Sequence, residues 1–361
     1  MKQAIFFLML IFLIENLAAQ VKYKYKVEQV TEDIYVLRPE GSGYRWVTAN
    51  ITVVINKEDV LVVDSGLLPE AGREAIKEIR ELTDKPVKYL FNTHWHGDHW
   101  QGNEIFLKTF PDIEIIATKE GAEGIKQNGM LWVNKLYPKN FELMIDSYED
   151  RLKKGVKADG TKLSDEERDQ IKEGIELVKM DLTEVKKLKP IVPTLTFEKS
   201  MVLQCGDREI QFHYLGKGNT RGDGVIYLPQ ERILITGDLV VHPSPYESGT
   251  FSLEWLKTSQ RLAEFNYLKL IPGHGEVQHD TSYLDFLNAL FSEIIRQVNQ
   301  AYQEGSYTLE EYQKLVNHES VKSALSKESR FAEHIKKLSP GFVPTCVDRI
   351  HRQAHDRRLV D

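Results

Sequence analysis

A cluster of polar side chains follows directly after a predicted buried strand in the first third of the chain. Residues 87–91 are largely apolar and aromatic, as in a strand whose two faces are both covered. The next segment, residues 93–99, reads Thr-His-Trp-His-Gly-Asp-His and contains three histidines and one aspartate. Because packing rarely requires such side chains so close together, we interpret this segment as a metal-binding loop at the end of a strand.

The side chains of this loop differ in how the backbone presents them. His94 and His96 are two residues apart and can point the same way from an extended loop. Asp98 and His99 follow a tight turn that Gly97 permits. Imidazole nitrogen and carboxylate oxygen suit Zn²⁺ and related first-row ions, so the three histidines and the aspartate are candidate ligands.

Further ligands are expected at the ends of later strands, because one short loop rarely completes a catalytic metal centre. Asp238 follows a predicted strand at residues 233–235. His274 follows another predicted strand at residues 268–271 and lies between two glycines, which leave its imidazole unobstructed. Both residues are therefore added to the candidate metal ligands.

Predicted strands lie on both sides of a charged helical segment. Alternating and β-branched runs predict strands at residues 23–30, 34–37, 51–55, 60–63, 87–91, 201–203, 210–215, 225–228, 233–235 and 268–271. Helical periodicity predicts helices at residues 69–82, 253–265 and 283–303. Two β-rich halves that each contribute polar loops indicate an α/β protein with a four-layered αβ/βα sandwich.

The segment between the two halves, about residues 121–193, is rich in Lys and Glu. Ser164 and Glu167 fit a capping box, which predicts that a long helix begins there. The segment can be a solvated helical surface or, because it is inserted between two sources of ligands, a lid over the site; the sequence leaves both open. It also leaves open whether Cys205 and Cys346 form a disulfide.

The N-terminus has the pattern of a secretory signal. Lys2 precedes an unbroken apolar run at residues 4–14, and small residues follow. A membrane-spanning helix needs about 20 apolar residues, so this run is too short to span a bilayer. We predict a signal peptide at residues 1–19 and an exported protein, periplasmic or secreted, with no stable membrane insertion after cleavage. The predicted domains are a catalytic domain at 20–280, which includes the insertion, and a C-terminal helical extension at 281–361.

Charge and motif content narrow the classes of function. The formal net charge is −7, and no run of Lys and Arg has aromatic residues between its charges, which argues against a nucleic-acid-binding surface. No Gly-x-Ser-x-Gly motif is present, and neither cysteine has a histidine beside it in the sequence, so a serine or cysteine nucleophile is not expected. The expected partner is a small-molecule substrate, and the oligomeric state stays open.

The ligand motifs resemble those of the metallo-β-lactamase superfamily, in particular its glyoxalase II-like hydrolases, over about residues 34–274. The resemblance implies His94 and His96 as ligands of a first ion, Asp98, His99 and His274 as ligands of a second, and Asp238 as a bridge. It also implies that Asp64, in a Val-Asp-Ser-Gly motif, braces the ligand loop. It implies zinc, as one ion or two, with manganese or iron as other metals that suit these ligands.

One position departs from the pattern of the family. Asn219 stands where the family carries a histidine. An amide oxygen is a weaker ligand than imidazole, so the first site is expected to be loose, completed by water, or empty. His213 is expected to point into strand packing. Possible contacts for the substrate or the pocket lining are His242, Tyr246, Trp95, Trp100 and Trp132.

The sequence therefore predicts an exported metal-dependent hydrolase that acts on a lactam, lactone, thioester or ester. A metal-bound water, with its pKa lowered to about 7, would supply the attacking hydroxide. Asp98 is the predicted catalytic residue, orienting that hydroxide and passing a proton to the leaving group. An enzyme with one metal ion is the alternative to one with two. Its ligands would be Asp98, His99, Asp238 and His274.

Two other functions are retained as alternatives. A metallo-β-lactamase would suit an exported protein, but Asp238 occupies the position where the best-known lactamase subclass carries cysteine. Val241 and His242 also stand where a lysine would hold the carboxylate of the drug. The alternative of another class is a catalytically impaired binding protein with the same fold, in which Asn219 is the first lesion. The full set of other ligands favours an enzyme.

Overall fold

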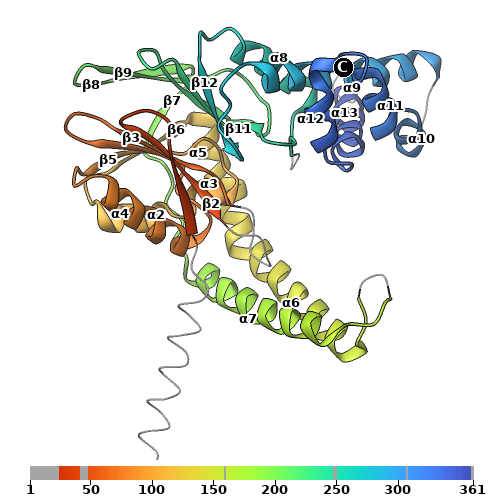
Figure 1. The fold of residues 1–361 in the computed structure, drawn as a ribbon, viewed down its shortest axis with the longest axis horizontal. Coiled ribbons are helices and arrows are strands. Elements are labelled where there is room, and N and C mark those ends of the chain that lie inside the picture. Colours follow the sequence, from red (N-terminus) through yellow and green to blue (C-terminus); the bar gives the residue numbers. More distant parts are fainter. Residues whose placement is uncertain (1–23, 41–47, 158–159, 247–249, 306–307, 359–361) are drawn as a thin grey trace, which may run out of the picture.

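The structure is a computed structural model that describes residues 24–40, 48–157, 160–246, 250–305 and 308–358. Two facing sheets form its centre, helices cover their outer faces, and a long helical hairpin projects from the body (Figure 1). The predicted signal peptide lies outside the described residues. No helix in the described ranges combines the length and the apolar character needed to cross a membrane.

The first sheet is mixed and has seven strands. In spatial order these are β1 (Lys24–Gln29), β2 (Ile34–Glu40), β3 (Ile51–Ile55), β4 (Val60–Val63), β5 (Val87–Phe91), β6 (Glu114–Thr118) and β7 (Leu195–Phe197). Neighbouring strands from β1 to β4 are antiparallel, and those from β4 to β7 are parallel. Helices α2 (Leu68–Leu82) and α4 (Asn103–Thr109) pack on its outer face.

The second sheet has five strands. In spatial order these are β12 (Lys269–His274), β11 (Ile233–Val241), β10 (Gly224–Leu228), β9 (Arg208–Tyr214) and β8 (Ser200–Cys205). Only the β11–β12 pair within this described sheet is parallel. Its outer face is covered by α8 (Ser252–Leu262) and α9 (Ser282–Glu304).

The alternation of side chains along the strands explains why the two sheets pack face to face. On β4, Val60 and Val62 join the core under α2 and α4, whereas Leu61 and Val63 face the second sheet. On β11, Ile235 joins the core between the sheets. Each sheet thus has two apolar faces and needs cover on both sides, which gives the predicted four-layered αβ/βα sandwich.

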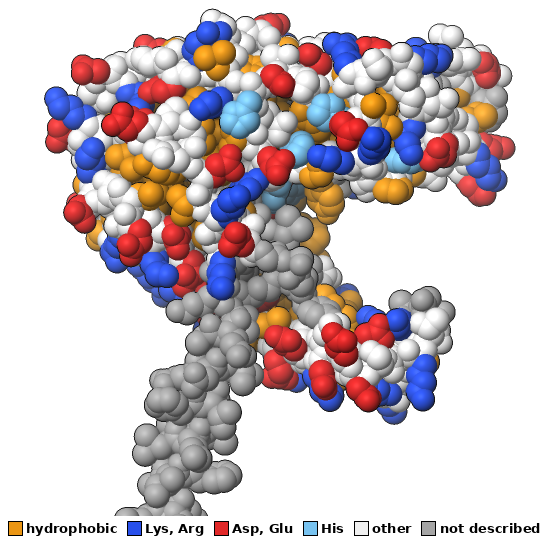
Figure 2. All heavy atoms as spheres, viewed as in Figure 1, with side chains coloured by type: hydrophobic (Ala, Val, Ile, Leu, Met, Phe, Trp, Pro, Cys, Tyr) orange, Lys and Arg blue, Asp and Glu red, His pale blue; other side chains and the backbone are white. Residues whose placement is uncertain are grey.

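The charged insertion forms the helical hairpin and its base. It contains α5 (Lys119–Gly124), two π-helical turns (Ile125–Gly129 and Trp132–Leu136), α6 (Tyr137–Lys154) and α7 (Asp165–Lys187). The predicted capping box is present, since Ser164 accepts a hydrogen bond from Glu167 N and Glu167 accepts one from Ser164 N. Figure 2 shows the surface hollowed between this hairpin and the C-terminal helices, and charged side chains over the hairpin.

The C-terminal part adds further helices to the outer face of the second sheet. These are α10 (Leu309–Leu315), α11 (His318–Leu325), a 3-10 turn (Ser329–Phe331), α12 (Ala332–Lys337) and α13 (Phe342–Arg358). Cys346 is buried in the core that these helices share with α9, and Cys205 is buried between the two sheets. Both cysteines are free, since they lie in different cores.

Strand β11 is longer than the sequence predicts, and this corrects the placement of Asp238. The predicted strand ends at Ile235, with Asp238 on a following loop, whereas β11 continues to Val241 and contains Asp238. Gly237 adopts a left-handed φ of 51°, and the pairing with β12 shifts register on both sides of it. The strand therefore bulges at this point and then resumes, which a Gly-Asp turn signal does not distinguish from a strand end.

Candidate metal centre

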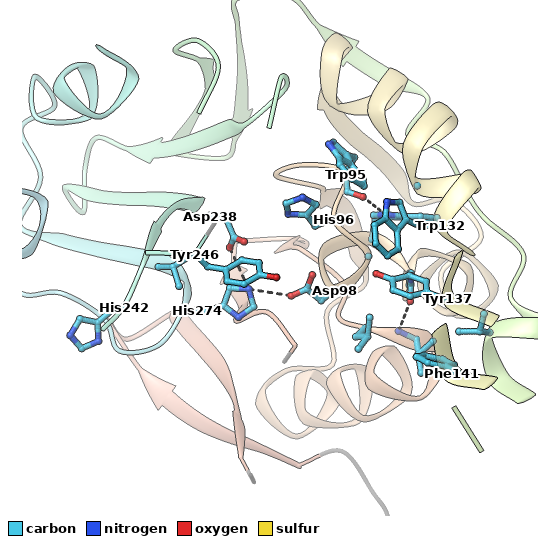
Figure 3. Close-up of a pocket in the computed structure, with 18 of the residues that line it drawn as sticks. Trp95, His96, Asp98, Trp132, Tyr137, Phe141, Asp238, His242, Tyr246 and His274 are labelled. Atoms are coloured by element: carbon cyan, nitrogen blue, oxygen red, sulfur yellow. Dashed lines mark hydrogen bonds and ion pairs between the residues drawn. The ribbon is translucent and has the colours of Figure 1, made fainter. Parts of the chain in front are cut away.

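The predicted metal ligands converge where strands of the two sheets end side by side (Figure 3). His94 and His96 follow β5, Asp98 and His99 lie in the short helix α3 (Gly97–Trp100), Asp238 lies in β11, and His274 ends β12. The first four come from the first sheet and the last two from the second, so the sandwich itself assembles the cluster.

One half of the cluster contains Asp98, His99 and His274, and we call it the His99 half. His274 Nε2 lies 3.1 Å from Asp98 Oδ2 and 3.4 Å from Asp238 Oδ1. His99 Nε2 lies 3.6 Å from Asp98 Oδ2 and 3.4 Å from the same oxygen of Asp238. Two imidazoles thus face two carboxylates, a donor set that suits a divalent transition-metal ion.

The other half contains His94, His96 and Asn219, and we call it the His94 half. His94 Nε2 lies 3.0 Å from His96 Nδ1 and 3.6 Å from Asp238 Oδ2. The Asn219 amide Nδ2 lies 3.4 Å from His94 Nε2, 3.3 Å from His96 Nδ1 and 3.3 Å from Asp238 Oδ2. The structure therefore brings Asn219 to the place where the family pattern expects a third imidazole.

Asp238 faces both halves with different oxygens. Its Oδ1 lies near His99 and His274, and its Oδ2 lies near His94. A Cβ at Gly273 would lie 2.1 Å from Asp238 Oδ1, so glycine is required for β12 to approach this carboxylate. The arrangement allows one carboxylate to serve two neighbouring ions.

Asp64 fixes the orientation of His99 from behind. Its Oδ2 lies 2.7 Å from His99 Nδ1 and accepts a hydrogen bond from Thr93 Oγ1, and its Oδ1 accepts one from Thr93 N. The buried Asp64 has a left-handed φ of 64°, a strained conformation for a non-glycine residue. By contrast, His94 Nδ1 faces a neutral hydroxyl, Thr93 Oγ1, at 3.0 Å.

Burial and charge act in opposite directions on the two fully buried histidines. Burial lowers the pKa of His94 well below its ordinary value, and the neighbouring His99 lowers it further. Burial also lowers the pKa of His99, but the surrounding carboxylates, first that of Asp98, outweigh burial and raise its pKa well above the ordinary value. The His99 half is therefore the more negative of the two.

Buried donor atoms show that this cluster fits a metal ion. Asn219 Oδ1 is buried and has no hydrogen-bond partner among the described residues, whereas His99 Nε2 and Asp238 Oδ1 are buried with only each other and neighbouring candidate ligands, at 3.4 Å or more. Buried polar atoms without a well-aligned partner are costly, and a bound cation would give these atoms one. The groups His94–His99–Asp238 and Asp98–His99–His274 each bring their ligand atoms within 4.8 Å of one another.

The remaining candidates from the sequence lie in different places. His213 is on β9, where its ring packs against Phe265 at 5.2 Å, away from the cluster as predicted. His242 and Tyr246 both line the cavity beside the cluster. Figure 3 shows Tyr246 pointing toward Asp98 and His242 standing apart from the ligands.

A cavity of about 560 Å³ opens onto Asp98, Asp238 and His274. Its lining includes all the aromatic residues that the sequence suggested, namely Trp95, Trp100, Trp132 and Tyr246. The sequence interpretation missed other lining residues, namely Leu67, Leu68, Gln101, Tyr137, Phe141 and Val185. The spacing of Trp132, Tyr137 and Phe141, which recur every four or five residues in the insertion, is the one signal that could have found some of them.

Comparisons with known proteins identify the family of this chain. The model of the metallo-β-lactamase superfamily matches residues 44–184. A type 2 metallo-β-lactamase of Bacillus cereus is 31% identical over 261 residues, which cover 70% of this chain and 77% of the lactamase. A linear primary-alkylsulfatase of Pseudomonas sp. (strain ATCC 19151) is 24% identical over 230 residues, 61% of this chain, and the match spans only 40% of that longer protein.

Similarity to solved structures concerns the fold. A metallo-β-lactamase from Pontibacter korlensis superposes with a TM-score of 0.52 at 18% sequence identity, covering 74% of this chain and 99% of that chain. At this identity the likeness establishes the shared sandwich and says nothing of a shared substrate.

Proposed function

This chain belongs to the metallo-β-lactamase superfamily and is one of its hydrolases, and on that premise we propose that it hydrolyses a small carbonyl substrate with the help of bound metal. The proposed substrate classes are lactams, lactones, thioesters and esters. The observation that carries the proposal is the cluster of four histidines and two aspartates, of which His96, Asp98, Asp238 and His274 line the cavity.

The proposed metal is Zn²⁺, as two ions of unequal affinity. The His99 half would hold the tighter ion and the His94 half the looser one, with Asp238 shared between them. Bound zinc would lower the pKa of a coordinated water and so make hydroxide available at neutral pH. The imidazole and carboxylate donors of the cluster support zinc over Mg²⁺ or Ca²⁺, which prefer oxygen ligands.

Asp98 is the proposed catalytic residue of the chain. It faces the cavity with a side chain that is 17% exposed, whereas Asp238 is only 5% exposed. Its carboxylate would orient the attacking water and carry a proton to the leaving group. The pKa of Asp98 is lowered, since the neighbouring imidazoles of His99 and His274 outweigh the effect of burial. It would therefore start as the ionised base.

Hydrolysis of β-lactams is the second candidate, because one relative with 31% identity is a metallo-β-lactamase. Asp238 and the Val241–His242 pair argue against it, as they replace the cysteine and the lysine of the best-known subclass. No lysine or arginine is among the described residues that line the cavity, which also disfavours a sulfate ester such as the alkylsulfatase would cleave.

A substrate panel on one protein preparation tests the proposal. Purified chain is stripped with EDTA, reloaded with zinc, manganese or iron, and assayed on an ester, a lactone, a thioester, a chromogenic cephalosporin and an alkyl sulfate. We expect zinc-dependent hydrolysis of at least one neutral carbonyl substrate, and a loss of about 100-fold or more in Asp98→Ala. Asp112→Ala, which removes an exposed carboxylate outside the cavity, is the matched control and should retain activity.

Three results would overturn the assignment. Hydrolysis that survives both EDTA and Asp98→Ala would show that the chemistry takes place elsewhere. A metal-loaded chain that binds but does not cleave any member of the panel would favour the impaired binding protein. Efficient turnover of the cephalosporin alone would establish the lactamase candidate instead.

Export is proposed as well, on the sequence of residues 1–19. Expression of the full chain in a bacterial host, followed by fractionation and N-terminal sequencing, tests it. We expect a mature protein that begins at Gln20 outside the cytoplasm. A cytoplasmic chain that keeps residues 1–19 would contradict the proposal.

A further inference from the structure

We propose that the cavity binds an uncharged, apolar alkyl or aryl group of the substrate, and that the helical insertion supplies the surface that recognises it. This inference rests on the proposed hydrolytic function and names the substrate class of that site. It assigns a role in specificity to Trp132, Tyr137 and Phe141, which come from the insertion and not from the sandwich.

Three aromatic rings of the insertion form one continuous wall. Trp132 and Tyr137 have ring centroids 5.3 Å apart, and Tyr137 stacks on Phe141 at 5.9 Å. Figure 3 shows these rings on the far side of Asp98 from His274 and Asp238. A substrate group attached to the reacting carbonyl would therefore enter between Asp98 and this wall.

The wall is held directly against the ligand loop. A Cβ at Gly97 would lie 2.7 Å from Tyr137 Oη, so the tyrosine hydroxyl lies on the loop at the residue before Asp98. At the base of the insertion, a Cβ at Gly124 would lie 2.8 Å from the Trp95 ring, and one at Gly129 would lie 2.8 Å from the Trp100 ring. The base of the insertion is thus a fixed wall of the cavity, while the hairpin beyond it projects away.

The compartment between Asp98 and this wall has a further apolar part, which is strained. Leu67 and Leu68, at the start of α2, line the cavity and pack in the same apolar cluster as Phe141 and Tyr137. Leu68 has a left-handed φ of 66°, which a β-carbon makes unfavourable. Gln101 Oε1 accepts a hydrogen bond from Leu68 N at 3.3 Å and holds this conformation. Strained residues of this kind tend to cluster at functional sites.

The charge of the cavity decides what kind of group it accepts. The charged side chains among its described lining residues are the carboxylates of Asp98 and Asp238 and the histidines beside them, with no lysine or arginine. An anionic group in the aromatic compartment would lose its hydration without gaining a partner there, which is costly. Burying apolar area against aromatic rings is favourable. The compartment therefore selects a neutral, apolar group.

Binding of two fluorescent probes to the metal-free chain tests this inference without any turnover. N-phenyl-1-naphthylamine is neutral, and 8-anilinonaphthalene-1-sulfonate has the same ring system with a sulfonate added. We expect the neutral probe to bind about tenfold more tightly than the sulfonate, because only the sulfonate would need a cationic partner. Equal or tighter binding of the sulfonate would overturn the inference.

Variants of the wall locate the binding. Trp132→Ala should weaken the neutral probe about tenfold, and Trp132→Phe should restore most of that loss, since an aromatic face is retained. Leu143→Ala is the matched control on α6, because Leu143 is 56% exposed and does not line the cavity. Unchanged probe binding in Trp132→Ala, or an equal loss in Leu143→Ala, would contradict the assignment.

Esters of increasing acyl length connect the compartment to catalysis. The zinc-loaded chain should show a kcat/KM about tenfold higher for p-nitrophenyl hexanoate than for p-nitrophenyl acetate, and Trp132→Ala should reduce that ratio. Hydrolysis with no preference for acyl length, together with no probe binding, would refute this inference and leave the hydrolase intact. Probe binding as expected with no hydrolysis of any ester, lactone or thioester would refute the proposed function alone.

Discussion

The two halves of the metal centre share one loop and one carboxylate, yet their surroundings differ. In the His99 half, a buried carboxylate stands behind His99 at 2.7 Å, and Asp98 adds a second carboxylate beside it. In the His94 half, His94 is backed by a neutral hydroxyl, and the third position is the amide of Asn219. The ligands of each half and the residues behind them together thus set how strongly that half should hold a cation.

Charge explains the direction of this difference. A cation entering the His99 half meets the carboxylates of Asp98 and Asp238, whose ionised forms the neighbouring imidazoles favour. A cation entering the His94 half meets the far oxygen of Asp238 and otherwise neutral donors. We therefore expect unequal affinities for two ions that lie side by side.

The largest effect should come from removing one ligand of each half in turn. His274→Ala should weaken the tighter zinc ion by more than about 100-fold, beyond the 10–100-fold cost typical of losing an outer partner. His96→Ala should leave that ion almost unchanged and should abolish the weaker one. Competition with a zinc-binding chelator dye measures both affinities. The reverse pattern, with the tighter ion lost in His96→Ala, would exchange the roles of the two halves.

A smaller effect is expected from the residue behind His99. Asp64→Asn removes the charge that faces His99 Nδ1 but keeps a residue type that tolerates the left-handed backbone at this position. The tighter ion should lose about 10–100-fold in affinity. The affinity of the weaker ion, measured in the same titration, is the internal control and should stay within about threefold. An equal loss at both ions would indicate a general disturbance of the loop.

The smallest effect should be a gain. Asn219→His replaces the amide with the imidazole of the family pattern and should tighten the weaker ion about tenfold, because imidazole is the better zinc ligand. Asn219→Ala should weaken or remove that ion and leave the tighter one in place. Zinc content after dialysis against limiting metal reports both changes. No gain in Asn219→His would mean that the amide does not limit binding in this half.

The sequence predicted most of the layered fold because its signals are local. The β-branched runs at β3, β4 and β5 were predicted with the bounds that the structure shows, and the capping box at Ser164 began α7 as expected. The strands β6 and β7 and the helix α4 were not predicted, because they are short. Short elements depend on pairing with neighbours that lie far apart in the sequence.

The structure brings the predicted ligands together, whereas the walls of the cavity were predicted only in part. Histidine and aspartate are common metal ligands, so their residue type marks them as candidates in the sequence. The convergence of His94 with His274 could therefore be predicted. The positions of Tyr137 and Phe141 could not, since a pocket wall depends on how the insertion docks on the ligand loop. The bulge that keeps Asp238 inside β11 was also missed, because it too depends on contacts between distant segments. Only the pairing with β12 distinguishes a bulge from a turn.

Zinc binding to the metal-free wild-type chain tests the unequal centre most directly. Equilibrium dialysis over a range of free zinc, with metal content measured per chain, should give two steps. The first ion should be complete before the second begins, with affinities at least about tenfold apart. Two ions that bind with the same affinity, or a single ion even at high zinc, would contradict the account.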